Sequence, residues 1–139
     1  MKFIVYRNSD GMILRSGETL WETLSLQAQA GETATSDDAD GATQYINVST
    51  GAVTTRPTLT ATWNKTSITA NGSDTAIFGS TLPNPTTVIV GVPVSATTPE
   101  AEQVTTGTFS ITTTIAGEYT VTITPPFPYI PVTQVITAS

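Results

Sequence analysis

The stretch that decides the fold lies in the last third of the chain and reads Ala116-Gly117-Glu118-Tyr119-Thr120-Val121-Thr122-Ile123-Thr124. Tyr119, Val121 and Ile123 alternate with threonines, which is the period of two expected of a strand with one face on a core and the other near water. Gly117 ends the preceding connection. In antiparallel sandwiches, a tyrosine at this place often turns its hydroxyl back to the loop backbone, forming a tyrosine corner. We therefore expect structural roles for Gly117 and Tyr119. An ordinary half-buried strand tyrosine would also fit, and both interpretations predict a β-sandwich.

Short strands separated by turns surround this stretch, as is typical of a sandwich. Arg56-Pro57 marks the beginning of the region, because proline ends a hydrogen-bonded ladder. We expect strands at residues 59–63, 67–69, 75–80, 86–92, 104–114, 119–124 and 132–137. The proline-rich run from Pro125 to Pro131 joins the last two strands and cannot belong to a central strand. Residues 57–139 are thus predicted to form an antiparallel β-sandwich domain.

Residues 1–56 predict a separate hairpin–helix–hairpin module. Asp10-Gly11 between two apolar runs is a strong hairpin signal, because both residues tolerate positive φ. Thr19-Leu20-Trp21-Glu22 fits a capping box for a short helix that runs from Leu20 to about Ala28 and is stopped by Gly31. Residues 32–35 predict a brief strand, and residues 43–48 and 52–56 predict a second hairpin. The module has few large apolar residues, so we expect it to be stabilised by packing against a partner or against the next domain.

Composition excludes several classes of function. The formal charge is −6 and the five basic residues are scattered over the first half of the chain, which argues against nucleic-acid binding. Without cysteine there is no thiolate metal site, and without histidine the commonest general base and metal ligand are missing. Serine and threonine are plentiful, but no nucleophile elbow and no Ser-x-x-Lys arrangement accompanies them. We expect a non-enzymatic protein with no catalytic, cofactor-binding or metal-binding residues.

The carboxylates do not predict a metal or glycosidase site either. Ser36, Asp38, Asp40 and Gly41 superficially follow the order of a calcium loop, but its twelfth position is Asn47 instead of a bidentate glutamate. We interpret this segment as a solvated acidic loop. The acids of the second half fall in predicted turns or at strand starts, where solubility explains them; they are Asp74, Glu100, Glu102 and Glu118.

Large aromatic residues supply the remaining candidates for contacts. Trp63 is expected to pack in the sandwich, while Phe127 and Tyr129 are candidates for an exposed contact. Their proline-rich run resembles a ligand for aromatic-lined grooves, but it lacks the Pro-Pro-x-Tyr order, and a rigid connecting loop is the favoured interpretation. The N-terminal apolar run is too short for a signal peptide, and no window is long enough for a membrane span, so we expect no membrane insertion.

Two motifs carry a resemblance to a known domain family. The run Ser67-Ile68-Thr69-Ala70-Asn71-Gly72-Ser73-Asp74-Thr75-Ala76 and the later Gly117-x-Tyr119-Thr120-Val121-Thr122 strand resemble bacterial immunoglobulin-like domains of the invasin and Big type. The resemblance covers about residues 57–139. It implies an immunoglobulin-like (Ig-like) β-sandwich, and it implies little about function, because this fold serves many roles.

The first half is similar in style to small virion proteins of tailed bacteriophages, some of which carry an Ig-like C-terminal domain. The similarity rests on residues 3–17, 26–28, 40–46 and 49–57. It implies a structural or accessory role in the virion, with residues 1–56 docking on the particle and the Ig-like domain projecting. The implied partners are other virion proteins, further copies of the chain and the host cell surface. An adhesin-type module that recognises a host glycan or protein is the alternative.

Overall fold

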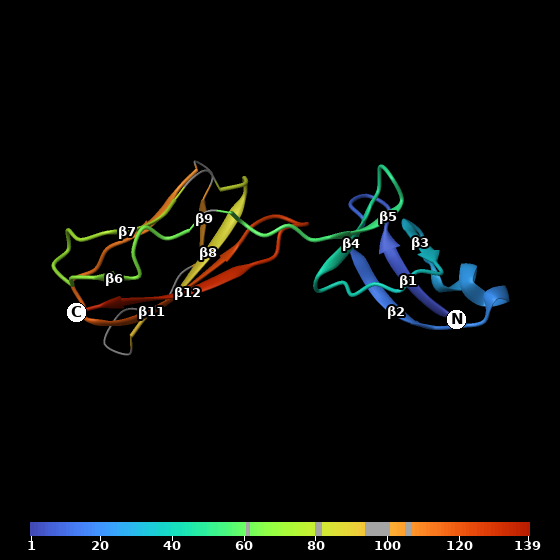
Figure 1. Ribbon diagram of the computed structural model, residues 1–139, viewed down its shortest axis with the longest axis horizontal. Coiled ribbons are helices and arrows are strands. Elements are labelled where there is room, and N and C mark those ends of the chain that lie inside the picture. Colours follow the sequence, from blue (N-terminus) through green and yellow to red (C-terminus); the bar gives the residue numbers. More distant parts are fainter. Residues whose placement is uncertain (61, 80–81, 94–100, 105–106) are drawn as a thin grey trace. The chain divides into compact units, whose positions relative to one another are not determined.

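The computed structural model of the protein describes residues 1–60, 62–79, 82–93, 101–104 and 107–139. Within these ranges the protein is mainly β, with strands β1 to β12 and one short 3-10 helix, η1 (Figure 1). The chain divides into two compact units, Met1–Pro57 and Thr58–Ser139. This division falls one residue after the break predicted at Arg56-Pro57.

The first unit contains a three-stranded antiparallel sheet and a separate hairpin. Strand β1 (Lys2–Arg7) lies in the middle of the sheet, between β2 (Ile13–Glu18) and β3 (Glu32–Thr35). Strands β4 (Gln44–Asn47) and β5 (Ala52–Thr55) form the hairpin. Both predicted hairpins and the predicted brief strand are therefore present. The buried apolar side chains of this unit are few: Phe3, Ile4, Val5 and Ile46.

The turn of the first hairpin is packed against β4. Gly11 has a φ of +77°, and its N–H donates to the Arg7 carbonyl oxygen at 2.8 Å. The Gly11 carbonyl oxygen in turn accepts from the N–H of Ile46 at 2.9 Å. A Cβ on Gly11 would overlap the Ile46 carbonyl group. Glycine is therefore required here by its backbone conformation and by the close approach of β4.

The helix differs from the one predicted. Helix η1 (Trp21–Gln27) is a 3-10 helix that begins after Leu20, and no side chain caps its first turn. The Thr19 hydroxyl lies 2.7 Å from the hydroxyl of Thr23, so Thr19 is engaged elsewhere and the predicted capping box is wrong. Leu20, Leu24 and Ala28 recur at the spacing of four that suits one face of an α-helix, but a 3-10 helix has about three residues per turn, and no residue of η1 is buried.

The predicted role of Gly31 as helix stop is also wrong. Helix η1 ends at Gln27, and the residue at its C-cap is Ala28. Gly31, with a φ of +82°, lies in a later turn in which the N–H of Glu32 donates to the Gln29 carbonyl oxygen at 3.0 Å. Its positive φ belongs to the turn that leads into β3.

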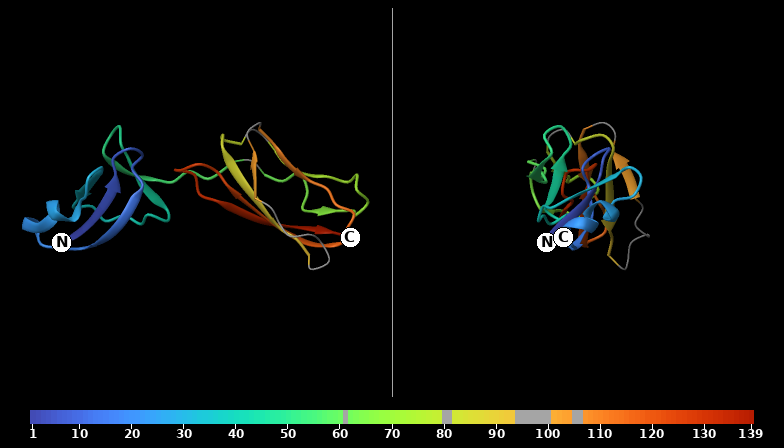
Figure 2. Two further views of the ribbon diagram at one scale, coloured as in Figure 1. Left: turned by 180° about the vertical axis from the view of Figure 1, so that it is seen from behind. Right: turned by 90° about the vertical axis from the view of Figure 1, so that its right-hand side faces the viewer.

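The second unit is built on a five-stranded sheet with the order β6-β12-β11-β8-β9. Strand β11 (Gly117–Thr124) is antiparallel to both β8 (Thr86–Gly91) and β12 (Val132–Ala138). Figures 1 and 2 show β11 and β12 running side by side. At the two edges, β6 (Ser67–Ile68) joins β12 in parallel, and β9 (Ala101–Val104) pairs with β8.

A two-stranded sheet shares the core of the five-stranded sheet. It pairs β7 (Ala76–Phe78) with β10 (Phe109–Ile111). On β11 the predicted alternation is confirmed, since Tyr119, Val121 and Ile123 are buried and the threonines between them are not. The buried residues of both sheets form one cluster: Ile68, Ala76, Phe78, Leu82, Val88, Phe109, Tyr119, Val121, Ile123, Ile136 and Ala138.

Two predicted strands are wrong because the chain changes sheets within them. The single strand predicted at residues 104–114 is divided between β9, in the larger sheet, and β10, in the smaller one. The strand predicted at 59–63 is replaced by two isolated bridges, a parallel one from Thr58 to Ile130 and an antiparallel one from Trp63 to Phe78. A segment that passes from one sheet to the other cannot keep one ladder. Ser80, at the end of the predicted strand 75–80, lies outside the described residues.

We predict that Gly11→Ala destabilises the first unit by at least about 2 kcal/mol, from positive-φ strain together with overlap of its Cβ with Ile46. Gly51→Ala is the matched control, because Gly51 also has a positive φ, +72°, but nothing lies within 4 Å of its added Cβ. It should cost about 1 kcal/mol. Native-state hydrogen exchange of the β1 amides measures both effects. Equal losses in the two variants would show that the contact with Ile46 does not matter.

Candidate functional site

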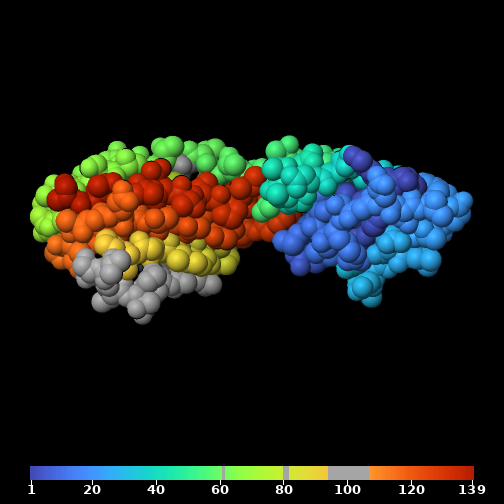
Figure 3. Space-filling model, turned by 90° about the horizontal axis from the view of Figure 1, so that it is seen from below, coloured from blue at the N-terminus to red at the C-terminus, as the bar shows by residue number. Residues whose placement is uncertain are grey.

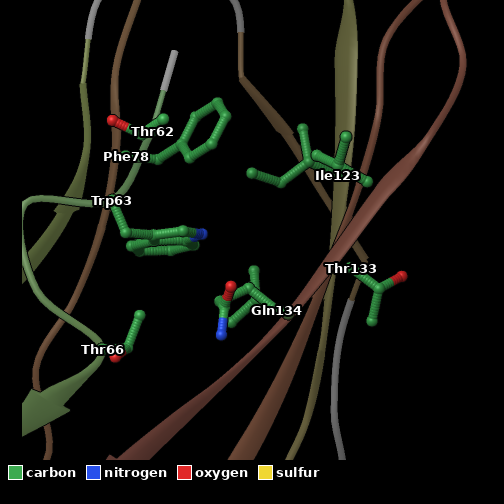
Figure 4. Close-up of a pocket in the computed structure, with 9 residues that line it drawn as sticks. Thr62, Trp63, Thr66, Phe78, Ile123, Thr133 and Gln134 are labelled. Carbon is green, nitrogen blue, oxygen red and sulfur yellow. The ribbon is translucent and has the colours of Figure 1, made fainter. Parts of the chain in front are cut away.

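The candidate site is a pocket of about 310 Å³ within the second unit. It lies between residues 62–66, which cross from one sheet towards the other, and the inward faces of β11 and β12 (Figure 4). Its walls combine aromatic, aliphatic and neutral polar side chains: Thr62, Trp63, Thr66, Phe78, Val121, Ile123, Val132, Thr133 and Gln134. None of these lining residues is charged, so the pocket offers apolar contact and neutral hydrogen bonds.

Trp63 is held in place by two aromatic neighbours. Its ring meets Phe78 edge-to-face, with centroids 5.4 Å apart, and Phe109 in the same manner at 6.1 Å. Trp63 therefore packs in the second unit as predicted, but it stays half-buried. In Figure 4 the nitrogen-bearing edge of the indole points into the pocket. Within the described part of the chain no acceptor bonds the indole N–H, which leaves it available to a ligand.

The pocket exists because the edge of β12 is only partly covered. At one end Thr58 bridges to Ile130, and at the other the N–H of Thr137 donates to the Thr66 carbonyl oxygen at 2.9 Å. Alternate residues of a strand direct their N–H and C=O groups to the same side. Thr133 and Val135 therefore face the same edge as Thr137, and no backbone group of a described residue pairs with them there. Between its two closed ends, the edge is therefore open with respect to the described residues, which do not include Ala61.

Gln134 is the polar residue that lies deepest on the β12 side of the pocket. It belongs to the inward row of β12 and is paired in register with Val121. Its Nε2 donates to the Val135 carbonyl oxygen at 3.0 Å, which satisfies one group of the open edge. Its Oε1 receives no hydrogen bond from any residue that the structure describes. The Thr62 and Thr66 hydroxyls are likewise unbonded within that part of the chain.

The sequence contained one signal for this pocket that our predictions missed. The inward row of β12 reads Val132, Gln134, Ile136, and a glutamine in such a row must find a hydrogen-bond partner or water. A polar residue at a position that the alternation of the strand directs towards the core thus indicates an opening in the core. The crossing segment at residues 62–66 could not be read in the same way, because it was expected to be a strand.

Tyr119 makes the backbone contact that the Gly117-x-Tyr119 pattern predicts. Its hydroxyl donates to the Ile115 carbonyl oxygen at 2.9 Å, and the Thr113 hydroxyl lies 2.7 Å from the Tyr119 hydroxyl oxygen. The side chain is only 5% exposed. Gly117 has a φ of +144°, and a Cβ there would approach Pro93 Cγ to 2.6 Å. Both residues have structural roles at the start of β11, and neither lines the pocket.

Phe127 and Tyr129 lie in the connection between β11 and β12, away from the lining of the pocket. Both side chains are half-buried, and the exposed contact predicted for them stays a prediction. The N–H of Tyr129 donates to the Pro126 carbonyl oxygen at 3.2 Å, so the prolines fold this connection into a turn.

The carboxylates of the acidic loop have local structural partners. Asp38 pairs with Lys2 at 2.6 Å, and Asp40 accepts from the N–H of Ala42 at 2.9 Å. Among the residues that the structure describes, no three acidic side chains come together as metal ligands would. In the second unit, Glu118 is exposed at the start of β11, and Glu100 lies outside the described residues.

Asp74 ties the turn before β7 to the crossing segment. It pairs with Lys65, and it accepts from the N–H of Thr69 at 2.9 Å. The hydrogen bond from Lys65, followed by that from Thr69, lowers the pKa of the Asp74 carboxyl below its ordinary value. In the first unit, Arg7 lowers the pKa of Asp10 and Arg15 lowers that of Glu32 in the same way.

Comparison with models of protein families, with curated proteins and with solved structures finds no match for this chain. Of the helical segments that the structure describes, none has the length and apolar character to cross a bilayer. Function must therefore be argued from the residues themselves.

We predict that Tyr119→Phe destabilises the second unit by about 1 kcal/mol or more, because the buried Tyr119 side chain loses its hydrogen bonds with the Ile115 carbonyl oxygen and the Thr113 hydroxyl. Thr120→Val is the control, since Thr120 lies on the exposed face of the same strand and no described residue bonds its hydroxyl. Urea unfolding followed by Trp63 fluorescence in a Trp21→Phe background reports on the second unit alone. An unchanged unfolding free energy in Tyr119→Phe would remove the structural role of this hydroxyl.

We also predict a pH-dependent contribution from Asp74. Its pKa is lower in the folded than in the unfolded state, so its stabilisation is fully present above the unfolded pKa and is lost as the pH falls through the folded pKa. The stability difference between the wild-type protein and Asp74→Asn should therefore shrink on acidification. Urea midpoints between neutral pH and pH ~3 measure it, with the exposed Glu118→Gln as control. A constant difference would contradict the linkage.

Proposed function

We propose that the protein is a non-enzymatic structural or accessory protein of a tailed-phage virion, in the tail tip, fibre or decoration apparatus. The first unit anchors it on the particle, and the second projects as an Ig-like domain. The proposal is carried by the uneven distribution of exposed apolar side chains between the two units, and it agrees with the resemblance of the first half to small virion proteins.

The first unit exposes large apolar side chains around η1. Leu20 is 71% exposed, Trp21 68% and Leu26 77%. We call these three residues the η1 apolar surface, and the space-filling view shows the light-blue segment around η1 open on the surface of its unit (Figure 3). Large apolar side chains exposed on one short segment are a feature of interaction sites. A seven-residue helix with no buried residue also gains little from its own unit, so a partner that covers it would stabilise it.

The second unit supports the Ig-like assignment through its topology. Strand β11 is central, β6 joins β12, the last strand of the chain, in parallel, and β7 and β10 form the opposing sheet over a shared core. The Tyr119 hydroxyl closes back on the loop before its strand, as the tyrosine corner of such domains does. This unit has a core of its own, whereas the first has few buried residues, and this contrast favours anchoring by the first unit.

The partners that fit this role are other virion proteins and further copies of the chain, arranged as a ring or trimer on the particle. The charge of −6 and the scattered basic residues give no support to a nucleic-acid partner. Assembly would take place in the host cytoplasm, and neither an enzymatic activity nor membrane insertion belongs to the proposal. A second candidate function is an adhesin-type module that contacts the host surface, and the uncharged pocket beside Trp63 favours it.

We predict that the η1 apolar surface is needed for attachment to the particle. In a phage that encodes this chain, complementation of a null mutant with a Trp21→Ser/Leu26→Ser double variant should reduce the protein in purified particles at least about tenfold. Ile89→Ser is the matched control, because Ile89 is 45% exposed but lies on β8 of the second unit. Its incorporation should equal that of the wild-type protein.

Deletion variants test, in the same assay, which of the two units attaches the protein to the particle. Removal of residues 1–56 should abolish incorporation, whereas removal of 57–139 should preserve it. If only the second unit attaches, the anchor and the projection are reversed. If the wild-type chain is absent from purified particles, the proposed virion role is wrong.

A further inference from the structure

We propose that the pocket beside Trp63 binds one neutral sugar ring, a hexose or N-acetylhexosamine of a surface glycan. This inference rests on the second candidate function, contact with the host surface, and names the ligand for it. Sequence patterns assigned no ligand to this region.

The closed ends of the pocket select a compact ligand. A peptide strand could hydrogen-bond to the open groups of Thr133 and Val135, but it would meet the chain itself at both ends of the opening. Thr58 closes one end through its bridge to Ile130, and Thr66 closes the other through its bond to Thr137. The volume of about 310 Å³ is at the lower end of the range for small-ligand sites. A single ring fits these limits better than an added strand.

The apolar walls match the apolar side of a sugar. A pyranose ring carries C–H groups on its faces, and an aromatic ring packs against them with dispersion and electrostatic attraction. Phe78 and Phe109 hold the indole of Trp63 from two directions, so this surface is already oriented before a ligand arrives. Val121, Ile123 and Val132 line the pocket as well, and they provide the apolar contact that a ring needs.

The polar groups match the hydroxyls at the rim of a sugar. The indole N–H of Trp63 and the Thr62 and Thr66 hydroxyls supply donors, and Gln134 Oε1 supplies an acceptor. None of these is bonded to another described residue. Sugar hydroxyls both donate and accept, so they can satisfy all of them.

The absence of charge on the lining residues decides between neutral and anionic sugars. An acidic sugar would have to bring its carboxylate to a site without a cation, which is costly. The nearby amine in the sequence, Lys65, is already paired with Asp74. The pocket therefore favours neutral hexoses and N-acetylhexosamines over sialic or uronic acids.

The test uses the full chain carrying Trp21→Phe. The sequence has two tryptophans, so this substitution leaves Trp63 as the only source of tryptophan emission. Glucose, galactose, N-acetylglucosamine and N-acetylgalactosamine are titrated and Trp63 emission is followed, with N-acetylneuraminic acid as the anionic probe. We expect a saturable change for at least one neutral sugar, with Kd of about 1 mM, typical of a weak single-ring contact, and none for the anionic probe.

Variants place the binding in the pocket. Gln134→Leu removes the acceptor and keeps the size of the side chain, so it should weaken binding about fivefold to tenfold. Thr120→Val, on the exposed face of β11, is the control and should bind as before. Trp63→Ala is avoided because it would also disturb Phe78 and Phe109. Circular dichroism and urea unfolding verify that both variants are folded.

Three results would overturn the inference: no saturable response to any neutral sugar, equal or tighter binding of N-acetylneuraminic acid, or unchanged affinity in a folded Gln134→Leu protein. If Gln134→Leu is unfolded, Thr66→Val, at an exposed position, takes its place with the same expectation. Particle incorporation is measured separately. Failure of sugar binding with normal incorporation would remove the ligand and leave the virion role standing.

Discussion

Strand β11 is paired on both of its edges, and its three inward side chains are buried in the core that both sheets share. A shift of one residue would move Tyr119, Val121 and Ile123 to the outer face and bring threonines into the core. The hydroxyl of Tyr119 adds a polar constraint, because it reaches the Ile115 carbonyl only in the observed register. The arrangement of the other strands in the second unit follows from this strand.

The pocket is a consequence of the same constraint. Strand β12 takes its register from β11, which fixes Gln134 in the inward row opposite Val121. A glutamine at that position cannot be packed like the apolar residues around it, and it uses its Nε2 to satisfy the edge at Val135. Meanwhile residues 62–64 pair with β7, where Trp63 bridges to Phe78, and the chain returns to β12 only at Thr66. An opening with neutral polar groups and one aromatic wall results.

The sequence predicted those parts of the fold that depend on local rules. The alternation on β11 and the Asp10-Gly11 turn were readable because side-chain period and turn conformation are local properties. The capping box failed because Thr19 contacts Thr23 instead, and the strands at 59–63 and 104–114 failed because the chain changes sheets there. Trp63 was recognised as a core aromatic. That it also borders a pocket depends on the path of residues 62–66, which no local pattern encodes.

The two units differ in how completely they cover their own apolar groups, and this difference is the basis of the proposed division between anchor and projection. Hydroxyl-radical footprinting with mass spectrometry, on the free protein and on purified particles, tests it most directly. Oxidation of Trp21 and Leu26 should be strong in the free protein and largely suppressed on the particle, whereas Ile77, an exposed residue of β7, should be oxidised equally in both. Equal oxidation of Trp21 in the two states would contradict the account.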